Sequence, residues 1–218
     1  MWLLQALGQQ RAPGSLLLEM LEPGQQARVD AVRGAVMHGD WPADLPQALA
    51  WQQGWDWQLY GDLLRHALAQ PEPLLAANLE RDEIGRIYRA VPALQGEAAT
   101  APAVRTQLLE QIREAHCGLL PESQLPAMLA VQQQRDRRMA ERLLAAPTPA
   151  ILLAGAFHVR RDLGVPLHLT DLGAAGGLQV LQLAEVGGPV AATHADFVWY
   201  TPAQPLQDRC AALREQGR

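Results

Sequence analysis

The chain has 218 residues, 49% of them hydrophobic, so it is long enough to bury a substantial core and lies near the upper size of a single domain. Its formal net charge of −5 is spread without long runs of one sign, which excludes an electrostatic basis for binding nucleic acid. No segment approaches the roughly 18 consecutive apolar residues that a membrane-spanning helix needs.

Short apolar runs bounded by turn residues predict a set of strands. The five runs are 15–20, 74–79, 150–154, 178–183 and 197–200. Helical patterns, including 45–51 and 59–68, lie between them, so strands alternate with helices. We therefore expect an α/β fold with a mainly parallel sheet flanked by helices, in which the last two runs are edge strands. Glu19 lies near the end of the first run, at the sheet edge where open α/β proteins bind ligands.

Two tryptophans and a tyrosine lie close together at the start of a predicted helix, as Trp55, Trp57 and Tyr60. Tryptophan usually belongs to a core or an interface. The phenol of Tyr60 is also suited to ligate ferric iron, as tyrosine does in catalase-type haem sites. A structural role and a ligand role are therefore both open for Tyr60.

The segment 101–146 has no strand pattern and contains two helix-like stretches interrupted at 118–121, which predicts a helical hairpin inserted into the α/β body. One apolar stripe of the first helix is expected to be core. Its members recur at helical spacing: Val104, Leu108, Ile112, Ala115 and Leu119. We expect this insert to be a subdomain within a single 1–218 domain.

The first helix of this insert ends with His116, which is explained by the favourable position of a histidine near a helix C-terminus. Because neighbouring residues on a helix point about 100° apart, His116 is not expected to activate Cys117 as a nucleophile. Cys117 and Cys210 are the only cysteines, and whether they form a disulfide is left open.

The second helix of the insert carries a face of mixed chemistry. Its members at helical spacing are Met128, Gln132, Arg135 and Met139. This face is too polar for a simple core. Two interpretations are open: it lines a pocket for a ligand with an apolar body and acidic edges, or it is a partly exposed flank of the helix.

His158 comes just after the third predicted strand. Gly155, in the intervening turn, has no side chain and so lets the backbone approach a ligand closely. The imidazole of His158 is suited to bind a metal or, when protonated, a carboxylate. A structural hydrogen bond is the other interpretation that the sequence leaves open for this residue.

Several familiar signals are absent from the sequence. It contains no phosphate-binding loop, no Gly-x-Gly-x-x-Gly after a strand, no Gly-x-Ser-x-Gly elbow and no His-Glu-x-x-His pair, so common cofactor and hydrolase motifs give no support. The first residues, MWLLQALGQQR, have only a short apolar stretch and no lipidation cysteine, so we do not expect them to be an export signal.

Six stretches match motifs of one family, in that family's order. AGAFHVRRDLGVPLHL (154–169) resembles the pattern AGxxHxRxDxGVPxHL, and HCGLLPESQLPAMLAVQQQRDRRMAERL (116–143) resembles the family's helical insert. The other stretches are LLLEMLEPGQQ (16–26), WDWQLYGDLL (55–64), AANLERDE (76–83) and FVWYTP (197–202). The chain thus resembles the ChaN-like haem-binding, iron-regulated lipoproteins of the haem-binding uptake, Tiki-like superfamily. The family's lipoprotein signal and its first strand, which ends in a GExHD-like motif, are not found here.

This resemblance implies a protein of bacterial iron and haem uptake in the cell envelope. It implies ferric haem as the cofactor, with a tyrosinate as axial ligand, and a homodimer that encloses the haems. Membrane association is expected only through a lipid anchor, which this sequence lacks, and no enzymatic activity is expected.

The resemblance also implies roles for particular residues. Tyr60 lies in a family motif and is the first choice for the iron ligand, followed by Tyr88 and Tyr200. The other expected haem contacts are His116, His158 and Arg135 to the propionates or the distal side, and Met128 and Met139 to the porphyrin.

Two alternatives compete with haem binding. A metal-dependent hydrolase of the same superfamily would use Glu19 and His158 at the sheet edge. A non-catalytic interaction protein would use its tryptophan-rich surface to dimerise and would bind no cofactor.

Overall fold

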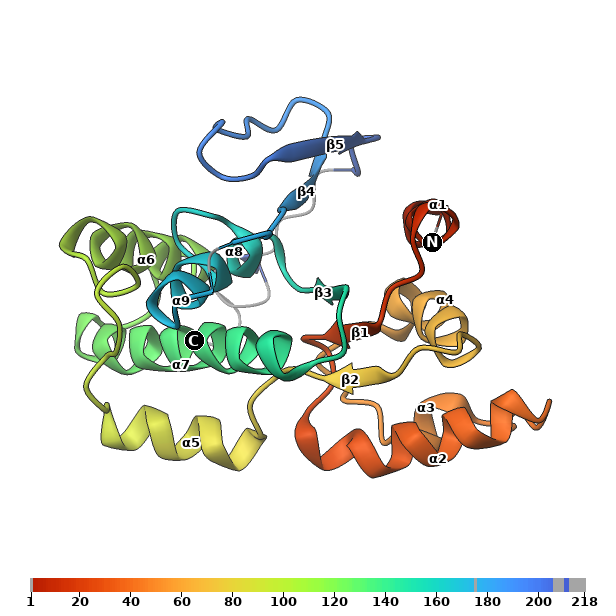
Figure 1. Cartoon of the computed structure of the whole chain (residues 1–218). Helices are drawn as coiled ribbons and strands as arrows, with labels where there is room; N and C mark the ends of the chain where they lie inside the picture. Colours follow the sequence, from red (N-terminus) through yellow and green to blue (C-terminus); the bar gives the residue numbers. More distant parts are fainter. Residues whose placement is uncertain (1, 175, 206–209, 212–218) are drawn as a thin grey trace. The chain divides into compact units, whose positions relative to one another are not determined.

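The computed structural model describes residues 2–174, 176–205 and 210–211 (Figure 1). The chain forms two compact units, and each is described by itself. The first unit consists of residues 1–81 and 141–154, and the second of residues 82–140 and 155–218.

A three-stranded parallel sheet forms the centre of the first unit. Its strands are β1 (Ser15–Leu18), β2 (Leu74–Ala76) and β3 (Ala150–Leu153), and they lie in the order β2-β1-β3 (Figure 1). Leu17 lies in register with Leu75 on one side and with Leu152 on the other. The first three predicted strands are therefore confirmed, and the parallel arrangement confirms the expected α/β fold.

The helices of the first unit are α1 (Trp2–Gln10), α2 (Gln26–Met37), α3 (Leu45–Ala48) and α4 (Trp57–Leu68), with a 3₁₀ turn, η1, at Pro23–Gln25. Helix α4 begins where the carboxylate of Asp56 accepts a hydrogen bond from the backbone N–H of Gln58, at 2.9 Å. Its buried leucines, Leu64 and Leu68, pack in one cluster with Leu16 and Leu18 of β1. The apolar face of this helix thus covers the central strand.

The helices of the second unit are α5 (Arg81–Ala90), α6 (Pro102–Ala115), α7 (Leu125–Ala145), α8 (Ala156–Val159) and α9 (Val165–Asp171), with a 3₁₀ turn, η2, at Glu122–Gln124. Arg81 and the end of α7, from Glu141, belong to the first unit. The predicted pair of helices within 101–146 is present as α6 and α7. That they form a subdomain inserted into a single 1–218 domain stays a prediction.

The expected apolar stripe of the first insert helix is core only in part. Leu108 and Ile112 are buried, and Val104 packs against them. Ala115 is exposed, and the side chain of Leu119 is 52% exposed. The prediction is wrong for both residues. For Leu119 the reason is that α6 ends at Ala115 and the backbone then turns, so helical spacing no longer decides which way this side chain faces.

The last two predicted strands form a sheet of their own. Strands β4 (Leu181–Glu185) and β5 (Phe197–Thr201) pair with each other in parallel and, among the described residues, not with β1–β3. They are therefore not edge strands of the first sheet. The carboxylate of Asp196 accepts hydrogen bonds from the backbone N–H of Val180 at 2.7 Å and from the guanidinium of Arg161 at 2.6 Å, which holds the start of β5.

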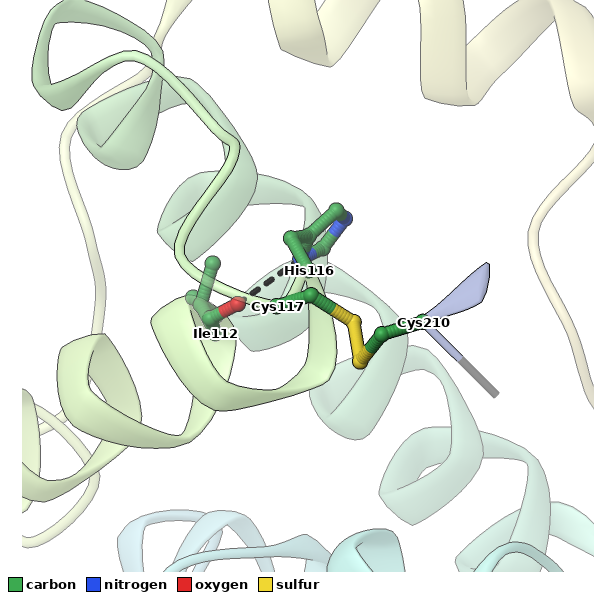
Figure 2. Close-up of a disulfide and its surroundings, with 4 residues drawn as sticks. All are labelled: Ile112, His116, Cys117 and Cys210. Atoms are coloured by element: carbon green, nitrogen blue, oxygen red, sulfur yellow. Dashed lines mark hydrogen bonds between the residues drawn. A yellow bond between two sulfur atoms is a disulfide. The ribbon is translucent and has the colours of Figure 1, made fainter. Parts of the chain in front are cut away.

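Cys117 and Cys210 form a disulfide with their Cα atoms 5.8 Å apart (Figure 2). Cys117 lies just beyond α6, where its φ of 58° and the φ of 68° at Gly118 are both in the left-handed region. This conformation lets the N–H of Gly118 donate to the carbonyl of Arg113 at 2.8 Å, which closes the helix end. The sequence left open whether the two cysteines pair, and the structure shows that they do.

Leu64→Ala tests the core of the first unit. Leu64 has 0% of its side chain exposed, so we expect its truncation to lower the free energy of unfolding by about 2–5 kcal/mol in urea denaturation. Leu59→Ala is the matched control on the same helix, because Leu59 is 74% exposed. Equal losses for the two variants would contradict the described packing of α4.

Candidate functional site

The six predicted site residues are divided between the two units. Tyr60 belongs to the first unit, on α4. The other five belong to the second unit and are His116, Met128, Arg135, Met139 and His158. The arrangement of these five residues can therefore be described together, and Tyr60 is described with its own surroundings.

Tyr60 lies in an aromatic cluster of the first unit. Its ring packs edge-on against Trp55 at a centroid distance of 5.6 Å, and tilted against Trp51 at 6.3 Å. Burial raises the pKa of the Tyr60 phenol above its usual value, and the negative charge of Glu19 raises it further. Glu19 is itself buried, directly after β1. The phenol is therefore protonated at neutral pH, and a metal that binds it has to displace the proton.

The mixed face of α7 is half-buried at Met128, Gln132 and Arg135 and fully buried at Met139. The Nε of Arg135 is buried and has no hydrogen-bond partner among the described residues. In contrast, Arg138 on the same helix forms an ion pair with Glu83 at 2.7 Å. A buried guanidinium N–H without an acceptor is costly, so the site fits an acidic ligand group that would supply one.

A carboxylate and a histidine are paired in the interior of the second unit. Asp136 is 0% exposed, and its Oδ1 accepts a hydrogen bond from Nδ1 of His158, which is itself 8% exposed. The amide of Gln132 lies 3.1 Å from the same histidine nitrogen and 3.4 Å from the other oxygen of Asp136. The carboxylate therefore fixes the orientation and the tautomer of His158.

Asp136 was not among the residues that the sequence singled out. The signal was present, because Gln133 and Asp136 are polar residues at helical spacing on a helix that also carries buried apolar residues. Both are buried, and Gln133 donates to the carbonyl of Ala99 at 2.7 Å. Asp136 is flanked in the sequence by Arg135, Arg137 and Arg138, so nothing there indicates that its partner is a histidine 22 positions later.

His116 is half-buried at the end of α6. Its Nδ1 lies 2.7 Å from the carbonyl oxygen of Ile112, so this nitrogen carries the proton and donates to that oxygen (Figure 2). The bond agrees with the structural role that the helix end predicts for this residue. The disulfide removes the thiol of Cys117, so a cysteine nucleophile at this position is excluded.

A metal-dependent site receives no support from the part of the chain that the structure describes, because no group of three or more histidine, cysteine, aspartate or glutamate side chains there is suited to hold a metal ion. Glu19 and His158, the pair expected of a hydrolase, belong to different units. Of the described helices, none is long and apolar enough to cross a membrane.

These features define an α/β protein with a parallel sheet and a helical region whose partly buried face combines thioether and guanidinium groups. The sequence model of the family described as haem-binding uptake, Tiki superfamily, ChaN matches residues 1–169, and the chain belongs to this family. Family membership indicates haem as the bound cofactor, which confirms the family and cofactor predictions.

The structure is also similar to that of ChaN from Campylobacter jejuni, which is described as showing cofacial heme binding. The TM-score is 0.79 at 30% sequence identity, over 90% of this chain and 77% of the ChaN chain. No curated protein matches the sequence. Neither comparison tests the individual site residues, which stay predictions.

Asp136→Ala tests the buried pair. Removing Asp136 takes away the carboxylate that accepts a hydrogen bond from a buried histidine nitrogen, so we expect a loss of about 1–3 kcal/mol in the free energy of unfolding, measured in urea. Glu122→Ala is the control, because Glu122 and Arg113 form an exposed ion pair whose loss is expected to have no measurable effect. A stability of Asp136→Ala equal to that of the wild type would show that the pair does not hold α7 and α8 together.

Proposed function

We propose that this chain binds ferric haem and acts as a haem carrier in bacterial iron uptake rather than as an enzyme. Membership of the haem-binding uptake family supports this function. The observation in the molecule that favours it most is the buried Nε of Arg135, which lacks an acceptor among the described residues and lies on the same helix face as Met128. A ligand with an apolar body and carboxylate edges would contact the Met128 side chain and supply the acceptor that the Arg135 N–H lacks.

Bound haem supplies a ferric iron with an axial position for a protein ligand. We propose that Tyr60 fills this position, because a phenolate oxygen is a hard anionic donor that favours Fe(III), which suits transport rather than redox chemistry. Tyr88, half-buried on α5, and Tyr200, 49% exposed on β5, are the alternatives.

The remaining predicted contacts have distinct chemistry. Arg135 is proposed to donate to a propionate, as are Nε2 of His116 and the imidazole of His158, which Asp136 orients. Met128 offers a half-buried thioether to the porphyrin. Met139 is fully buried, so its contact with haem requires that the side chains covering it move.

The disulfide bears on where the protein works. Structural disulfides persist in oxidising compartments, including the bacterial periplasm, and are rare in the cytosol. The Cys117–Cys210 bond therefore supports a proposed location in the cell envelope. We also propose a homodimer that encloses haem, a proposal supported by the cofacial heme binding described for ChaN of Campylobacter jejuni.

Titration with ferric haem tests this function. We expect a saturable change in the Soret absorption of the wild type, and for Tyr60→Phe an altered spectrum with at least a tenfold loss of affinity, on the order of 1.4 kcal/mol or more. Tyr88→Phe and Tyr200→Phe are matched controls that remove the same hydroxyl. An unchanged Tyr60→Phe spectrum with a changed Tyr88→Phe spectrum would transfer the ligand role to Tyr88. No saturable change in the wild type would refute haem binding.

The pH dependence of this affinity tests the protonation of Tyr60. Because the raised pKa keeps the phenol protonated at neutral pH, coordination releases a proton, and affinity should rise by roughly tenfold per pH unit between about pH 6 and about pH 8. Tyr60→Phe should lose this pH dependence. Any pH dependence that remains in this variant comes from the titration of haem itself.

Glu19→Gln tests the cause of the shifted pKa. Removing the negative charge lowers the pKa of Tyr60, so we expect tighter binding of ferric haem at neutral pH. Asp62→Asn, an exposed change on α4, controls for net charge. Weaker binding by a folded Glu19→Gln variant would count against Tyr60 as the ligand.

A further inference from the structure

The second unit contains a pocket of about 420 Å³ that none of the predicted site residues lines. It is formed by the segment after α5, by α6 and by the start of α7, and residues of its wall include Leu94, Leu109, Leu129 and Ala130. Its volume is within the range of small-molecule pockets, about 300–1,000 Å³. The pocket is therefore large enough to take part of an extended ligand.

Arg105 is the one charged residue that lines this pocket. It is exposed, and among the described residues its guanidinium has no hydrogen bond or ion pair. By comparison, Arg113 on the same helix is paired with Glu122 at 2.8 Å. The other polar side chain of the wall, Thr100, donates its hydroxyl to the carbonyl of Gly96. The pocket thus combines an apolar wall with a single unpaired cation.

We infer that this pocket holds an edge of the haem, with the apolar periphery against the leucines and one propionate on Arg105. This inference rests on the proposed haem binding. The planar fork of arginine matches a carboxylate, and a macrocycle with two carboxylates has the complementary combination of charge and apolar surface. Leu94 and Leu109 also pack against the same buried core cluster as Met128, the predicted porphyrin contact.

Haem and its dimethyl ester, in which both propionates are uncharged, test the role of Arg105. We expect Arg105→Ala to weaken haem binding about tenfold and to leave the affinity for the ester unchanged, since the ester lacks the carboxylates that Arg105 pairs with. Arg28→Ala, an exposed arginine on α2, controls for the loss of a positive charge. An equal effect of Arg105→Ala on haem and ester would overturn the inference.

Pro126→Glu tests the position of the ligand without endangering the fold. Pro126 is exposed in the first turn of α7, where a carboxylate is favourable to the helix, and it lines the pocket. The new negative charge should repel the propionate and weaken haem binding. Pro102→Glu, in the first turn of α6 and outside the pocket wall, is the matched control and should bind as the wild type does.

The outcomes separate the two proposals. Saturable haem binding by the wild type supports the proposed function whatever the variants do. If the wild type binds haem while Arg105→Ala and Pro126→Glu bind it as tightly as their controls, the haem lies elsewhere and the inference about this pocket is wrong. Saturable binding of decanoate that leaves haem affinity unchanged would assign the pocket to a separate aliphatic acid and would also overturn it.

Discussion

The burial of β1 is the constraint on which the first unit depends. All four of its side chains are buried, and it has a parallel neighbour on each side. Parallel neighbours cannot be joined by a tight turn, so each pairing requires a long crossover. The crossover from β1 to β2 contains α2, α3 and α4. The chain then runs from β2 through α5, α6 and α7 to β3, which pairs with the other side of β1. The helices that carry Arg105 and Arg135 are therefore part of the connection that the sheet demands.

Local patterns were sufficient to predict the elements but not their partners. Apolar runs between turn residues located the five strands of the described residues. Burial on both faces explains the continuous apolar run of β1, whereas β4 and β5 are partly exposed. The same runs could not show that β4 and β5 pair with each other, since pairing depends on the path of the chain between them. Leu119 followed the stripe of α6 in sequence but lies beyond the end of the helix, where periodicity has no meaning.

The candidate site shows the same division between local and distant information. Family motifs indicated His116, His158 and Arg135 as functional residues, yet no spacing could reveal that Asp136 orients His158. The pocket around Arg105 was missed because its wall comes from three segments, each unremarkable by itself. Whether an arginine such as Arg105 has an acidic partner can be seen only in the structure, because that partner can come from any part of the chain.

The disulfide has a consequence for how the protein is made. Cys117 and Cys210 are 93 residues apart, so the bond cannot close until that length of chain has been synthesised. Until it closes, each of the two thiols can form a bond to another chain instead. Oxidation is thus a late event in maturation, and the yield of correctly closed monomer should depend on how crowded the nascent chains are.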